Sequence, residues 1–82
     1  MYKKNLDYVF VKFEGDFYLY SPQKSIKLNE SAARILDLCD GTNSIEDICN
    51  VLGKKYPETK NLKEIVERTI NHLSQLGVLV NN

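Results

Sequence analysis

The sequence predicts an α+β fold in which three N-terminal antiparallel strands pack on a three-helix bundle. Residues 8–28 contain short aromatic and β-branched runs that are separated by turn residues. Three stretches with helical periodicity follow, and each is preceded by a residue that can cap a helix. Sheet and helices must cover one another, because neither buries its apolar face alone. A chain of 82 residues is one domain in size, so we assign residues 1–82 to a single unit.

The three strands are predicted from the residues that form and break them. Tyr8–Phe13 and Phe17–Tyr20 are rich in aromatic and β-branched residues, and the turn Glu14–Asp16 between them contains a glycine that can take positive φ. Ser21–Gln23 breaks the second strand. In the third strand, Lys24–Leu28, apolar side chains alternate with polar ones, which is typical of a sheet with one face in water.

The first two helices are predicted from their caps and apolar stripes. Asn29 caps the first helix and Gly41 ends it. Ser44 and Asp47 form an approximate capping box for the second helix, and Pro57 prevents its continuation. The apolar stripe of the first helix is Ala32, Ile35, Leu36 and Cys39, and that of the second is Ile45, Ile48, Cys49, Leu52 and Tyr56.

The third helix has a wider apolar arc than core packing requires. It runs from about Leu62 to Leu76, begins at a predicted capping box of Asn61 with Glu64, and ends at Gly77. With 3.6 residues per turn, one stripe suits the core and a semi-polar flank lies beside it. The core stripe is Leu62, Val66, Ile70 and Leu73; the flank is Ile65, Thr69, His72 and Leu76, bordered by Arg68. Residues 78–80 predict a short extended tail, either a small wing or an added strand.

Composition and cysteine spacing exclude several classes of protein. The 11 basic and 11 acidic residues give zero net charge, which argues against a nucleic-acid binder. No apolar run approaches the ~20 residues of a membrane span, and the N-terminus lacks the apolar region of a signal peptide. We therefore expect a cytoplasmic protein without membrane contact.

The sequence predicts neither a metal site, nor a cofactor, nor an enzyme. Cys39, Cys49 and His72 would supply at most three scattered soft ligands, too few for a closed zinc site. We expect both cysteines to be free thiols that fill space in the core. The chain has one histidine, no Ser/His/Asp set with plausible spacing, and no glycine-rich phosphate loop.

The flank of the third helix and the third strand form a candidate peptide-binding groove. An edge strand exposes unpaired main-chain groups, which invite the addition of another strand. Two alternatives remain open. In one, the sheet or the C-terminal tail covers the flank of the third helix. In the other, Lys24 and Lys27 only keep the edge of the third strand soluble. The candidate peptide-binding residues are Lys24, Ser25, Ile26, Lys27, Leu28, Ile65, Arg68, Thr69, His72 and Leu76.

The caps and stops of this chain also resemble those of a known family. The most telling segments are Leu28–Ala33, the Asp40-Gly41 stop, Ser44–Ile48 and Leu76–Leu79. They resemble the PqqD-like proteins, or precursor-peptide recognition elements, over roughly residues 8–80. The resemblance implies a non-catalytic domain that binds the leader of a ribosomally synthesised, post-translationally modified precursor peptide. In that family the leader adds as a strand beside the third strand, and its side chains dock on the third helix.

The resemblance also implies a modifying enzyme as partner, such as a radical S-adenosylmethionine enzyme, a cyclodehydratase or a leader peptidase. We expect a monomer or weak dimer. The order of strands and helices is also similar to a winged-helix layout, so the alternative function is a DNA-binding regulator. Lys54, Lys55, Lys60 and Lys63 would meet phosphate in that case, although Glu58, Glu64 and Glu67 lie among them.

Overall fold

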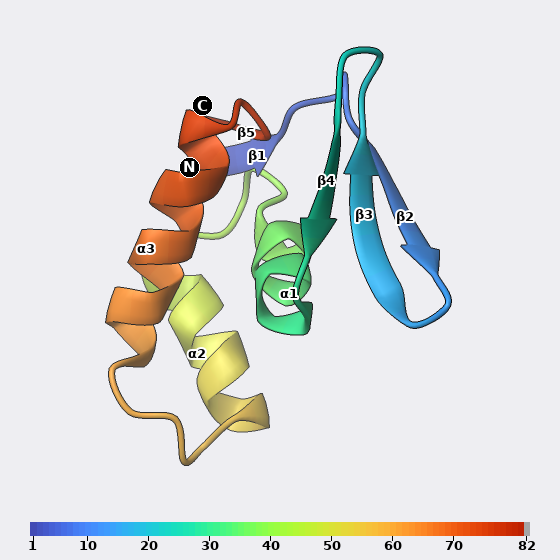
Figure 1. The fold of residues 1–82 in the computed structure, drawn as a ribbon. Coiled ribbons are helices and arrows are strands. Elements are labelled where there is room, and N and C mark those ends of the chain that lie inside the picture. Colours follow the sequence, from blue (N-terminus) through green and yellow to red (C-terminus); the bar gives the residue numbers. More distant parts are fainter. Residues whose placement is uncertain (82) are drawn as a thin grey trace.

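The computed structural model describes residues 1–81 and has an α+β fold with three helices and two antiparallel sheets (Figure 1). In Figure 1 the larger sheet lies to the right of the helices. Within the described residues, no helix is long and apolar enough to cross a membrane. The elements are β1 (Tyr2–Lys4), β2 (Val9–Phe13), β3 (Asp16–Tyr20), β4 (Ser25–Leu28), α1 (Glu30–Leu38), α2 (Ile45–Lys55), α3 (Leu62–Gln75) and β5 (Leu79–Asn81).

The three predicted strands form the larger sheet in the order β2-β3-β4. Glu14 and Gly15 join β2 to β3 with positive φ values of 51° and 84°, the conformation of a tight hairpin turn. Phe17 pairs with Leu28, and Leu19 pairs with Ile26, so these apolar side chains share the face that packs on the helices. Because β3 is central, β4 lies at an edge of the sheet.

The second sheet joins the two ends of the chain. Strand β1, which the sequence analysis did not predict, pairs with β5 through Lys3 and Val80. The predicted extended tail is therefore an added strand. The Gly41 N–H also donates to the Tyr2 carbonyl at 2.9 Å and ties the end of α1 to β1. A strand of only three residues carries little periodic signal, and its pairing with residues almost eighty positions away is a tertiary property.

Two of the three predicted helix caps are confirmed, and one is wrong. The Asn29 side chain accepts from the Ala32 N–H at 2.8 Å. Ser44 and Asp47 form the reciprocal capping box. Asn61, however, has a left-handed backbone (φ 57°) and makes no side-chain cap, because a capping residue needs an extended backbone. Glu64 does not reach back to Asn61 but binds Arg68.

One core lies between the larger sheet and the helices. Its buried side chains come from every helix and from the strands β3, β4 and β5. On α1 the buried alanine is Ala33, whereas Ala32, which was assigned to the apolar stripe, is only half-buried. Cys39 is fully buried, as predicted for a core residue, and burial raises the pKa of its thiol to about 11. The main buried residues are Leu19, Leu28, Ile35, Leu36, Ile48, Leu52, Val66, Ile70, Leu73 and Val78.

The C-terminal end of α3 is held by side chains from the N-terminal half of the chain. The Leu76 carbonyl accepts from the Tyr8 hydroxyl at 3.2 Å and from the Lys24 ammonium at 3.3 Å. The Asn5 amide donates to the Gly77 carbonyl at 2.9 Å. These carbonyls would otherwise lack partners, as the last carbonyls of any helix do. The bonds therefore connect the end of α3 to the segment that leads into β2 and to the start of β4.

We predict that Ile35→Ala or Ile48→Ala destabilises the fold by about 2–5 kcal/mol, as buried aliphatic truncations do. Both side chains are 1% exposed. Urea denaturation followed by circular dichroism measures the loss. A variant with unchanged free energy of unfolding would contradict the assigned core.

We predict that Gly53→Ala stabilises α2 by about 0.5–1 kcal/mol, because alanine lowers the entropic cost of forming a helix. An added Cβ would lie 3.8 Å from the Leu62 side chain, an ordinary contact. Gly77→Ala is the matched control and should lower the stability instead of raising it. Its φ of +79° strains an alanine by about 1–2 kcal/mol. The same denaturation experiment compares the two variants, and a loss of stability in Gly53→Ala would contradict the prediction.

Candidate functional site

A groove of about 290 Å³ lies between the edge strand β4 and helix α3. From this point we call it the β4–α3 groove. It is lined by Ile26, Lys27, Leu28, Asn29, Ala32, Arg68, Thr69, His72, Leu73 and Leu76. Leu28 and Leu73 are buried and form its floor, while Ile26 and Leu76 are half-buried walls. The groove is therefore apolar at its base and polar along its rim.

The free edge of β4 presents main-chain groups to this groove. The Ser21 N–H donates to the Lys24 carbonyl at 2.9 Å, which makes Ser21 and Lys24 a hydrogen-bonded position of the β3–β4 ladder. Hydrogen-bonded and non-bonded pairs alternate along an antiparallel ladder. Ser25 and Lys27 consequently direct their N–H and C=O groups away from β3. In the described residues 1–81, no strand pairs with β4 on that side.

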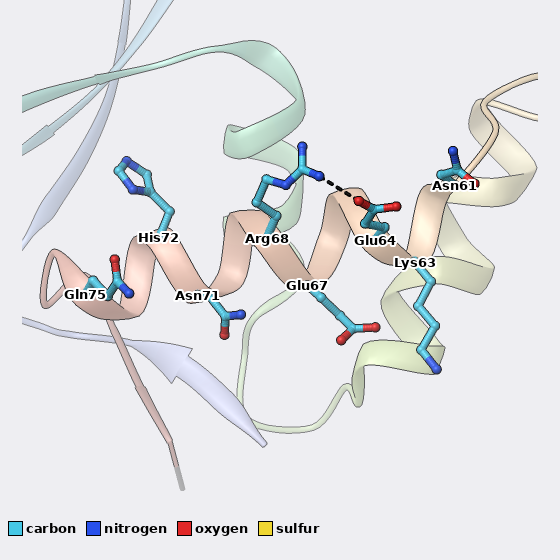
Figure 2. A pocket seen from close by; sticks show the side chains of 8 residues that line it. All are labelled: Asn61, Lys63, Glu64, Glu67, Arg68, Asn71, His72 and Gln75. Atoms are coloured by element: carbon cyan, nitrogen blue, oxygen red, sulfur yellow. Dashed lines mark hydrogen bonds and ion pairs between the residues drawn. The ribbon is translucent and has the colours of Figure 1, made fainter.

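Polar side chains lie on two sides of helix α3, as Figure 2 shows. Arg68 and His72 point toward the side where β4 leads into α1, whereas Glu67 and Asn71 point toward the opposite side. The Arg68 guanidinium donates to the Glu64 carboxylate at 2.7 Å, the dashed line in Figure 2. On the strand side of the groove, the Lys27 ammonium lies 3.6 Å from the Asp16 carboxylate. Both pairs are solvent-exposed, so each contributes little to stability and can exchange partners.

The structure brings together most of the candidate residues, but three of them lie elsewhere. Lys24 is outside the lining, but its ammonium donates to the carbonyl of Leu76, which does line the groove. Ser25 is outside the lining and offers main-chain groups only. Ile65 lines a neighbouring pocket between the helices, because it lies one turn before Thr69 on α3.

Three groove residues were missed by the sequence analysis in this role. Asn29 and Ala32 were assigned to a cap and to a core stripe, and Leu73 was assigned to the core. Asn29 does act as a cap, and Leu73 is buried. The signal that points to the groove was the position of Asn29 and Ala32 directly after the edge strand, where a small side chain leaves room.

The lining has the chemistry of a binding surface. Its ionisable side chains are one ammonium, one guanidinium and one imidazole, and it has no carboxylate or thiol. In the described part of the chain, no three His, Cys, Asp or Glu side chains lie close enough to hold a metal ion. Main-chain donors and acceptors on one side face aliphatic side chains on the other.

Comparison with known proteins places this chain among small relatives. Residues 16–79 match the family described as "Coenzyme PQQ synthesis protein D (PqqD)". The chain is 34% identical over 59 residues to the "PqqA binding protein" of Methylococcus capsulatus. The aligned region covers 68% of this chain and 63% of that protein. It is 30% identical over 67 residues to the protein of the same name from Rahnella aquatilis. Here the aligned region covers 82% of this chain and 70% of the relative. No solved structure matches this chain at a comparable level of significance.

The chain spans a little under two thirds of the length of the Methylococcus protein, and half of the Stutzerimonas stutzeri relative, which is 44% identical over 46 residues. The family match begins at the first residue of β3 and ends at the first residue of β5, so it includes β4, all three helices and both sides of the groove. As the caps and stops in the sequence had predicted, this chain belongs to the PqqD family.

Proposed function

We propose that this protein binds the leader segment of a ribosomally synthesised precursor peptide and presents it to a modifying enzyme without catalysing a reaction itself. The observation that carries the proposal is the unpaired edge of β4, which lies across a groove from the apolar flank of α3. The name that the curated relatives share, PqqA binding protein, supports a role in binding.

The leader adds to β4 as a further antiparallel strand of the larger sheet. Ser25 and Lys27 then offer two N–H donors and two C=O acceptors to its main chain, which supply affinity for any sequence. On the α3 wall of the groove, Thr69, His72 and Leu76 contact every second side chain of the leader. The others point away, because successive side chains of a strand point to opposite faces. Main-chain bonds thus provide affinity and the helix flank provides specificity.

The rim favours a leader that carries carboxylates. Lys27 and Arg68 are cations on opposite sides of the groove, and both are already close to an exposed carboxylate of this chain. An acidic leader takes the place of Asp16 or Glu64 at little cost. Exposed charges of this kind act mainly on the association rate and its dependence on salt.

The partner enzyme belongs to one of the classes that modify such peptides: a radical S-adenosylmethionine enzyme, a cyclodehydratase or a leader peptidase. The protein acts as a monomer or weak dimer, since strand addition needs a β4 edge that a second copy does not cover. Three helices beside a three-stranded sheet, as in a winged-helix layout, here serve peptide binding.

We predict that Ser25→Pro weakens peptide binding by about 1–3 kcal/mol, because it removes one N–H donor and leaves a peptide carbonyl unsatisfied. The probe is a peptide enriched from a displayed library of random peptides of about 16 residues, which extend far enough to span the groove. Isothermal titration calorimetry measures the affinity.

The matched control for Ser25→Pro is Lys12→Pro on β2. The two-residue turn Glu14-Gly15 makes Phe13 and Asp16 a hydrogen-bonded pair, so Lys12 directs its N–H to the other free edge of the sheet. Lys12→Pro should leave affinity unchanged. Equal effects of the two prolines, or failure of the library to yield any binder, would contradict the proposed function.

We predict that Thr69→Tyr reduces affinity for the same peptide by about tenfold or more, because the larger side chain fills the groove between α3 and β4. Asn71→Tyr places the same side chain on the opposite side of α3, where Figure 2 shows Asn71, and should bind normally. Circular dichroism confirms that both variants fold. Undiminished binding by a folded Thr69→Tyr protein would reject this wall of the site.

A further inference from the structure

A second apolar pocket lies between the three helices, beyond the end of the β4–α3 groove. Its volume is about 430 Å³. Ile35 and Leu52 are buried and form its floor, and Tyr56 and Leu62 are half-buried walls. Ile65 stands at the mouth and is 36% exposed. We call this space the interhelix pocket, defined by Ile35, Leu52, Tyr56, Leu62 and Ile65.

The interhelix pocket continues the surface along which a bound leader lies. Asn29 lines both the β4–α3 groove and this pocket. On α3, Ile65 at the pocket and Thr69 at the groove are four residues apart, about 6 Å along the helix axis. An extended peptide covers that distance in about two residues. A single chain can therefore occupy both spaces without a turn.

The pocket accepts an apolar side chain at little electrostatic cost. Its only charged lining residue is Glu30, whose carboxylate accepts from the Arg34 guanidinium at 2.9 Å. The charge at the rim is thus already compensated. The volume exceeds that of any one aliphatic or aromatic side chain, and filling the space would remove Ile65 and Tyr56 from water. Such burial of apolar surface favours binding.

We propose that the interhelix pocket is a second subsite for the same leader peptide, resting on the proposed function. It takes one bulky aliphatic or aromatic side chain, about two to four residues beyond the stretch that adds to β4. The strand-adding stretch supplies general affinity, and this anchor side chain selects among leaders. The favoured substrate is an extended peptide with an isolated large apolar residue at a fixed offset from its strand.

The test combines variants of the protein with an alanine scan of the library-selected peptide. We expect one apolar peptide residue at that offset to lose about tenfold in affinity when it is replaced by alanine, as interface anchors do. Ile65→Asp should lose about tenfold against the original peptide. It should lose nothing further against the alanine peptide, because the two changes remove the same contact. Val51→Asp is the matched control, since Val51 is 47% exposed on α2 and lines neither space.

The outcomes separate this inference from the proposed function. If Ser25→Pro weakens binding as predicted while Ile65→Asp and Val51→Asp both bind normally, the second subsite is wrong and the leader groove stands. A selected peptide with only polar residues at the expected offset also overturns the subsite. If Ser25→Pro binds normally, the proposed function itself fails. Coupled losses from Ile65→Asp and the anchor substitution, with Val51→Asp unaffected, support the subsite.

Discussion

Hydrogen bonds to the carbonyls of Leu76 and Gly77 connect the C-terminal end of α3 to the N-terminal half of the chain. A helix leaves these carbonyls without partners, and the chain supplies donors from its N-terminal half: Tyr8 and Lys24 to Leu76, and Asn5 to Gly77. Lys24 lies directly before β4, so its bond couples the start of the strand to the end of the helix. Leu76 also lines the groove, and Leu28 and Leu73 line it as members of the buried core.

The same arrangement explains why, within residues 1–81, no strand lies on the outer edge of β4. The N-terminal strand β1 pairs with β5 at the end of α3 and does not extend the larger sheet. An open strand edge is a liability that proteins usually blunt with charges, especially lysine. Lys27 lies within β4, and Lys24 precedes it. Both are compatible with the proposed peptide ligand, because their ammonium groups are exposed to solvent whereas the outer main-chain groups of Ser25 and Lys27 face the groove.

Helix α3 serves stability and the proposed binding function with different side chains. Val66, Ile70 and Leu73 are buried in the core, whereas Ile65 and Thr69 on the adjacent flank reach the two candidate subsites. Leu73 belongs to both sets, because it also forms part of the groove floor. Leu62 and Leu76 likewise pack on the core and line the pocket and the groove, respectively. This separation allows side chains of the flank to be replaced while most of the core side chains stay in place. It is also why flank substitutions can test binding without unfolding so small a domain.

Local residue chemistry by itself determined much of this protein. Alternation in residues 24–28, the caps at Asn29 and Ser44, and the apolar stripes of the helices predicted most elements and both sides of the groove, because each depends on neighbours within a few residues. Only the tertiary structure decided the β1–β5 pairing, the left-handed backbone of Asn61, the bond from Lys24 to Leu76, and the place of Ile65 in a separate pocket. The pairing and the Lys24 bond join residues far apart in sequence, and the pocket at Ile65 is closed by three helices at once. Asn61 takes a left-handed backbone in place of the extended one that a cap needs. Patterns of 2 or 3.6 residues contain no information about such contacts.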